Sequence, residues 1–397
     1  MSNGFIQLHF LTSYPASLLN RDDAGFAKRI PFGPAPRTRI SSQCLKRHWR
    51  TADGPYALNN IDGAAMAVRS RQTFERFIFR PLVEEHHIAE QLAREVTEAI
   101  IANVLGMSTR RSQERRKKEA EAVAELQTNQ LTVMGRPELD YLLAEARQLC
   151  AAAGDGSKVG DLLKRHFTAE KRENLRQLRL GAGLDAALFG RMITADVLAR
   201  CDAAIHVAHA FTVHAEASET DYFTAVDDLL REEDEGELGS AHINSAELTS
   251  GLYYGYVAVD SRLLHKNLSE DRALAAEVMR RLVHLIATVS PGAKLGSTAP
   301  HAYAHLMLAE VSSAQPRTLA NAFLTPVRPA PDPLANTYAA LATHLADLDR
   351  AYGRTQRRAL ALGPGERLAP ALEAAELCAS LGDLSAWVAA QAGEPQC

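Results

Sequence analysis

The sequence Arg37-Thr-Arg-Ile-Ser-Ser-Gln-Cys-Leu-Lys-Arg-His-Trp-Arg50 runs from two alternating arginines through a pair of serines into a short basic segment. The hydroxyl of Ser41 or Ser42 is a typical helix N-cap, because it accepts a hydrogen bond from an unpaired backbone N–H of the first turn. The stretch therefore predicts a helix that begins at one of these serines.

The predicted helix has a basic face and a packing face. Helical spacing places the polar and basic side chains together: Gln43, Lys46, Arg47 and Arg50. It places the others opposite: Leu45, His48 and Trp49. A helix N-terminus suits phosphate oxygens, and Lys46 and Arg50 one turn apart form a track for a phosphate backbone. The same pattern also fits an ordinary amphipathic helix with a solvated basic face.

Composition restricts the class of protein. A length of 397 residues allows two or three domains, or one domain with large insertions, and a hydrophobic content of 46% is enough for a sizeable core. No run approaches the roughly 18–20 apolar residues of a membrane span, and the N-terminus has no secretory features. The five cysteines are widely spaced and lack a CxxC pair, which argues against disulfides and zinc ribbons. We expect a cytoplasmic protein without membrane contact, metal or cofactor.

Charge is distributed unevenly along the chain. The net charge is −4, which is unusual for a protein that binds nucleic acid. The first fifty residues, however, hold eight Lys or Arg against Asp22 and Asp23, a net of +6. The whole-chain value therefore hides a basic region.

The N-terminal half predicts one strand, one long loop and one helical insertion. Phe5–Leu11 alternates as a strand does, and a proline- and glycine-marked loop is expected from Ser13 to Arg39. Residues 72–180 have mainly helical spacing. Within this insertion, the basic run 110–118 fits a solvated helix face or a mobile loop better than a binding site, and Gly154–Gly160 fits a helix–helix connection.

The C-terminal half predicts a projecting hairpin and further strands and helices. Strands are expected at 205–214, 252–260 and 303–311, a helix at 272–288, a turn at 291–296, and helices beyond Asn336. His206, His209 and His214 alternate between two faces of a strand, so packing or polar-face roles fit them better than a metal site. The polar excursion after residue 214 carries Tyr222 and Phe223, which could stack on bases or pack locally.

Ordered motifs support a family resemblance. They begin with Leu19-Asn-Arg-Asp-Asp23 and Arg39-Ile-Ser-Ser-Gln-Cys-Leu-Lys-Arg47. The others follow in order: Leu188–Met192, Val207–Ala210, Phe223–Leu229, Ser250-Gly251, Pro291–Lys294 and Ala320–Phe323. Together they resemble the backbone subunit (CasC family) of the type I-E CRISPR Cascade complex. Residues 55–185 resemble the family only in being helical, and the tail beyond about residue 340 only loosely.

The resemblance implies an α+β fold with an RRM-like (ferredoxin-like) palm, a helical fingers insertion and a β-hairpin thumb. The palm would comprise residues 1–60, 189–210 and 249–397, the fingers 61–188 and the thumb 211–248. It also implies a head-to-tail filament along a CRISPR RNA, which presents the guide to target DNA beside other Cascade subunits.

The resemblance assigns roles to individual residues. The residues expected to hold the RNA backbone are Lys28, Ser41, Ser42, Gln43, Lys46 and Arg50, with weaker assignments for Arg21 and Lys294. In this family a base of the guide is turned out at regular intervals. Met192, Phe223 and Thr224 are expected at the position of this disrupted base. Cys44 stands where the family has serine. Pro34-Ala-Pro36 stands where the family has a more basic, glycine-containing segment.

Two other functions remain open from the sequence. Related type III backbone subunits cleave target RNA with an aspartate after the first strand, and Asp22 and Asp23 could bind Mg²⁺ in that position. Alternatively, they could pair with Arg21 or Lys28 and brace the loop, which makes the subunit non-catalytic. A standalone RRM-type RNA binder would instead bind RNA selectively as a monomer.

Overall fold

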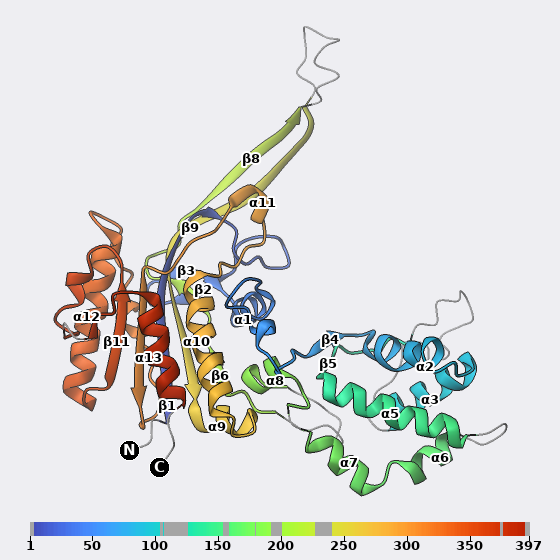
Figure 1. Ribbon diagram of the computed structural model, residues 1–397. Helices are drawn as coiled ribbons and strands as arrows, with labels where there is room; N and C mark the ends of the chain where they lie inside the picture. Colours follow the sequence, from blue (N-terminus) through green and yellow to red (C-terminus); the bar gives the residue numbers. More distant parts are fainter. Residues whose placement is uncertain are drawn as a thin grey trace. The chain divides into compact units, whose positions relative to one another are not determined.

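The structure is a computed structural model of the chain (Figure 1). The structure describes residues 4–103, 106, 126–153, 159–178, 180–191, 201–226, 240–373 and 376–393. The chain forms two compact units. The first contains Met1–Leu58, His206–Val259 and Ala276–Cys397, and the second contains Asn59–Ile205 and Asp260–Ala275.

The first unit is built on a large sheet. Its strands follow the order β11-β10-β1-β9-β7-β3-β2, and β8 and β6 pair with β9 in addition. Their bounds are β1 (Phe5–Ser17), β2 (Arg29–Phe32), β3 (Ala35–Ile40), β6 (Ile205–Val207), β7 (Ala210–Thr212), β8 (Ser218–Val226), β9 (Ser240–Asp260), β10 (Leu306–Ser312) and β11 (Gln356–Ala361). The pairs β1–β10, β10–β11, β2–β3, β3–β7, β7–β9 and β8–β9 are antiparallel. The predicted α+β class is confirmed.

Helices complete this unit. They are α1 (Ser42–Thr51), α10 (Arg272–Thr288), α11 (Leu295–Thr298), α12 (Pro333–Tyr352) and α13 (Leu381–Gly393), with short 3₁₀ turns at Leu58–Asn60, Ala320–Phe323 and Gly365–Leu368. One apolar cluster joins Tyr338 and Leu341 of α12 to Leu308 of β10 and Tyr254 of β9. This cluster secures α12 to the sheet by removing large apolar surfaces from water.

β1 is buried along most of its length, as expected for a strand in the middle of a sheet. Its side chains alternate between two packed faces. Phe10 packs edge-on against Trp49 of α1, whereas Leu11 belongs to the cluster beneath α12. The predicted strand Phe5–Leu11 is therefore confirmed and continues to Ser17.

A glycine in β9 makes room for the Phe10 ring. A Cβ added at Gly255 would lie 2.0 Å from Phe10 Cζ. We expect Gly255→Ala to destabilise the first unit by about 1–3 kcal/mol, because the ring or the strand must shift. Chemical denaturation followed by tryptophan fluorescence checks this, since Trp49 and Trp387 both lie in this unit. Gly296→Ala, which has open space around it, is the matched control, and equal stabilities would contradict the packing account.

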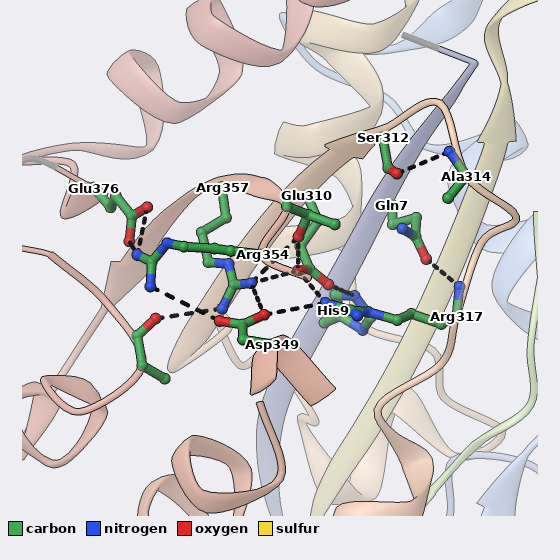
Figure 2. Close-up of polar contacts among 12 residues, drawn as sticks. Gln7, His9, Glu310, Ser312, Ala314, Arg317, Asp349, Arg354, Arg357 and Glu376 are labelled. Carbon is green, nitrogen blue, oxygen red and sulfur yellow. Dashed lines mark hydrogen bonds and ion pairs between the residues drawn. The ribbon is translucent and has the colours of Figure 1, made fainter. Parts of the chain in front are cut away.

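An ionic network is buried where β1, β10, β11 and α12 meet (Figure 2). Glu310 of β10 and Arg357 of β11 are both buried, and their closest charged atoms are 3.4 Å apart. Arg357 also donates to Asp349 Oδ1 at 2.5 Å, and the Thr355 hydroxyl donates to Glu310 at 2.5 Å. His9 Nε2 lies 3.4 Å from the other Glu310 oxygen.

The network lowers the pKa of Glu310. Burial alone would raise it, but His9, the Arg357 charge and the Thr355 hydroxyl outweigh burial and lower the pKa from 4.5 to about 2. Arg317 and Arg354 extend the network through Asp349, Arg317 at Oδ1 and Arg354 at Oδ2. These charges connect β1, at the start of the chain, to β10, α12 and β11.

The second unit is mainly helical. Its elements are β4 (Val68–Ser70), a π-helical turn (Glu75–Phe79), α2 (Arg80–Glu84), α3 (Glu90–Asn103), β5 (Thr132–Met134), α5 (Arg136–Ala152), α6 (Val159–His166), α7 (Ala169–Arg176), α8 (Leu184–Phe189) and α9 (Ser261–Asn267). Residues from Phe74 to Leu175 form its core. Arg191 and Glu138 form a buried bidentate pair at 2.6 and 2.7 Å. Within the described residues of 72–180, the chain is mainly helical as predicted, apart from the short strand β5 and the turn before it.

Several sequence predictions are wrong in detail. The loop expected from Ser13 to Arg39 contains the β2–β3 hairpin, and Pro31 is tolerated in β2 because β2 is the last strand of the sheet. The tail beyond Asn336 is not purely helical, since it contains β11, which pairs with β10. Arg357 of β11 is buried although it is charged. The strand expected at 205–214 is two short strands, and the one expected at 303–311 begins at Leu306.

No helix in the described part of the chain is long and apolar enough to cross a membrane.

Candidate nucleic-acid interface

Helix α1 begins where the sequence predicts. Ser41 is the N-cap, and its hydroxyl accepts a hydrogen bond from the backbone N–H of Cys44 at 3.3 Å. Leu45 and Trp49 are buried, which leaves Gln43 and Arg47 exposed and Lys46 and Arg50 half-buried on the other side. His48 is only half-buried, and its Nδ1–H donates to the Cys44 carbonyl at 2.8 Å. The predicted basic face is confirmed as the outer face of α1.

Asn20 joins the start of α1 to Lys28. Its side-chain oxygen accepts a hydrogen bond from the Ser41 N–H at 2.9 Å, at the start of α1. Its carbonyl accepts one from the Lys28 N–H at 2.9 Å. The sequence placed Asn20 in a motif but gave it no role. A short polar residue in a turn is the only signal that could have indicated one.

Lys28 is fixed by the backbone on both sides. Besides its bond to Asn20, its carbonyl accepts from the Arg39 N–H at 2.7 Å. The Arg39 side chain donates to the Arg29 carbonyl and to His209 Nδ1, both at 3.1 Å. Because an arginine side chain can only donate hydrogen bonds, His209 Nδ1 is the acceptor in this pair and carries no hydrogen. Burial first, and then the charges of Arg39 and Lys28, lower the pKa of His209.

Two other arginines of the basic N-terminal region are engaged within the fold. Arg37 is buried and donates to the carbonyls of Thr212 at 2.9 Å and Phe323 at 2.8 Å. Arg29 pairs with Glu216 and Glu247. The net charge of the first fifty residues therefore overstates the charge presented to a ligand.

Lys294 lies on the segment that leads into α11. The neighbouring Ala293 N–H donates to the Leu18 carbonyl at 2.9 Å, two residues before Asn20. The chain thus brings Lys294 close to the turn that carries Asn20 and Lys28. Arg21 is exposed in the same turn and forms a β-bridge with Ala27.

Asp22 is bonded to its own turn. Its Oδ1 accepts from the N–H groups of Ala24 at 3.0 Å and Phe26 at 2.9 Å, and its N–H donates to the Phe26 carbonyl at 2.8 Å. Asp22 therefore closes the turn through backbone groups, whereas the sequence led us to expect a partner in Arg21 or Lys28. Asp23 is exposed. Among the described residues, no group of three or more His, Cys, Asp or Glu side chains could hold a metal ion.

A family model described as CT1975-like protein matches residues 6–389. The chain belongs to the CT1975-like protein family. A solved chain of a "CRISPR RNA-guided surveillance complex, pre-nicking" has a TM-score of 0.78 and 25% identity, with 98% of this chain and 100% of that chain covered. The predicted resemblance to a CRISPR surveillance-complex subunit is confirmed.

A second solved chain has the same fold as this CT1975-like protein. It belongs to a "CRISPR RNA-guided surveillance complex" and has a TM-score of 0.68 and 21% identity, with 97% of this chain and 99% of that chain covered. No curated protein matches the sequence at a significant level.

The hairpin of the CT1975-like protein carries two of the predicted residues. Phe223 and Thr224 lie in β8, opposite Asn244 and Ile243 of β9, in a two-stranded ribbon (Figure 1). Tyr222, beside them, is 74% exposed. Met192 and the basic run 110–118 lie outside the described residues, as does Gly154, which begins the expected connection.

Cys44, in the position where serine was expected, is a poor nucleophile. Burial raises the pKa of its thiol, although the nearby Arg47 and Lys28 charges act in the opposite direction. A protonated thiol on the first turn of α1, directed at the Leu19 carbonyl, fits a structural role. The arrangement as a whole offers hydrogen-bond donors and positive charges along an exposed helix, which suits repeated phosphates better than a single small ligand.

Proposed function

We propose that this protein is a non-catalytic CRISPR RNA-binding backbone subunit of a type I-E Cascade surveillance complex. Copies assemble head to tail along the guide and present it for pairing with target DNA in antiviral defence. The proposed palm is an RRM-like core within the large sheet, the fingers lie in the helical second unit, and the thumb is the β8–β9 hairpin.

One observation carries the proposal: Asn20 ties the capped start of α1 to Lys28, and the outer face of that helix bears Gln43, Lys46 and Arg50. Backbone contacts of this kind hold a strand in register without reading its sequence. Sequence specificity then comes from base pairing with the guide.

Binding measurements with unrelated guide sequences test the proposal. The full chain should bind guides of different spacer sequence with similar affinities, and their affinities should fall together as salt rises. Strong preference for one sequence by a monomer would contradict the proposal and favour a standalone RNA-binding protein.

The alternative is a metal-dependent ribonuclease that uses Asp22 and Asp23. The hydrogen bonds of Asp22 to Ala24 and Phe26 support a bracing role instead. We expect the assembled complex to leave paired target RNA intact in Mg²⁺, and Asp22→Ala to loosen the turn without changing RNA integrity. Gel analysis of labelled target RNA checks this, with Asp23→Ala as the matched variant. Cleavage that either substitution abolishes would establish the ribonuclease.

A further inference from the structure

Two acidic residues at the root of the β8–β9 hairpin, Glu216 and Glu247, bind the start of β2, which follows Lys28. The Arg29 guanidinium donates from Nε to Glu216, just before β8, and from Nη2 to Glu247 of β9. The second Glu247 oxygen accepts from the Ala27 N–H at 2.7 Å. The hairpin root therefore holds the residue on each side of Lys28.

The root is also attached to two neighbouring strands. The Glu216 N–H donates to the Pro36 carbonyl of β3 at 3.0 Å. On β1, the Thr249 hydroxyl donates to the Ser17 carbonyl at 3.0 Å, and the Ala16 N–H donates to the Ser250 hydroxyl at 2.9 Å. These bonds hold the base of the ribbon, so Arg29 completes an existing set of constraints.

The burial of the charges shows why Arg29 is not a good phosphate ligand. The Glu216 and Glu247 side chains are only 15% and 9% exposed, whereas Arg29 is 37% exposed. Carboxylates this buried require a charged or hydrogen-bonding partner. A phosphate that recruited Arg29 would leave both carboxylates without their cation, which opposes such a contact.

We propose that Arg29, Glu216 and Glu247 form a clamp that couples the hairpin to the position of Lys28. Arg29 and Glu247 are then positioning residues for guide binding and do not contact the RNA. This inference rests on the proposed function, because its consequence is measured as guide affinity.

The clamp and simple electrostatics predict opposite effects of one substitution on the affinity for RNA. Glu247→Gln removes a negative charge close to a basic surface, so electrostatics alone would strengthen RNA binding. Loss of the Arg29 pair releases the hairpin root and the backbone around Lys28, so the clamp predicts weaker binding. Glu219→Gln is the matched control, because Glu219 is an exposed acidic residue of the same hairpin.

The experiment measures affinity of the full chain for a CRISPR RNA transcript, together with amide hydrogen exchange in the RNA-free protein. We expect Glu247→Gln to lose about tenfold in affinity, roughly one 1.4 kcal/mol step, and to exchange faster at Ala27 and the hairpin root. Glu219→Gln should bind as tightly as the wild type or more tightly. Arg29→Lys keeps the charge but replaces the guanidinium fork with a single ammonium, so it should weaken binding as well.

The outcomes separate the two levels of the proposal. Wild-type guide binding with undiminished affinity in Glu247→Gln and Arg29→Lys would overturn the clamp and leave the proposed function intact. Absence of guide binding by the wild type would overturn the proposed function and the coupling with it.

Discussion

Lys46→Ala and Arg50→Ala should each weaken binding of every guide RNA by a similar factor, whatever its spacer sequence. Each substitution removes a cation from the outer face of α1, where we place phosphate contacts. A charge-assisted hydrogen bond contributes about 1.5–3 kcal/mol, so the expected loss is roughly ten- to a hundredfold per variant. The slope of log affinity against log salt should flatten by about 0.7 per lost contact with single-stranded RNA.

Salt titrations with two unrelated guides measure both quantities. Arg350→Ala is the matched control, because this arginine is an exposed cation on α12 in the same unit. It should change neither the affinity nor the slope. A loss that depends on the spacer sequence would show that Lys46 or Arg50 reads bases, and equal affinities would remove α1 from the interface.

Glu310→Gln should destabilise the first unit by up to about 3–5 kcal/mol, because it removes the buried carboxylate that faces Arg357 and His9 and leaves Arg357 with Asp349 alone. The amide still offers an oxygen to the Thr355 hydroxyl, so the change isolates the charge. Denaturant unfolding followed by the fluorescence of Trp49 and Trp387 reports on this unit alone.

Glu376→Gln removes a charge from the solvent-exposed outer part of the same network. Glu376 pairs with Arg354, which is 39% exposed, so solvent screening should limit its cost to at most about 1 kcal/mol. Equal effects of the two substitutions would contradict a network centred on Glu310.

The low pKa of Glu310 also predicts an acid dependence. A carboxyl whose pKa is lower in the folded state stabilises the fold above its unfolded pKa and loses that contribution as pH falls through its folded pKa. With a pKa near 2 instead of 4.5, about 3 kcal/mol should be lost between roughly pH 5 and 2. The wild-type unfolding midpoint should fall across this range more steeply than that of Glu310→Gln.

The parts of the fold that the sequence predicted are those set by local patterns. Ser41 and the spacing of Leu45 and Trp49 defined α1, because capping and amphipathic spacing act within a few residues. Local strand-like patterns also identified β1 and the C-terminal part of β9. The helix Arg272–Thr288 was predicted with its bounds.

The remaining features depend on partners that are distant in sequence. Arg29 and Arg37 were counted in the basic N-terminal region, yet Arg29 pairs with Glu216 and Glu247, and Arg37 donates to the carbonyls of Thr212 and Phe323. The strand β11 was missed because its buried Arg357 is stabilised by Glu310 and Asp349 and not by an apolar neighbour. Charge counts cannot show which cations the fold has already neutralised.

Co-expression of this chain with a CRISPR array and its neighbouring genes tests the central claim most directly. The measurement is the native mass of the purified product together with the length of any bound RNA. A backbone subunit predicts a multi-subunit particle that carries several copies of this chain and one RNA of discrete guide length. A monomer without RNA, obtained in the presence of those genes, would contradict the account.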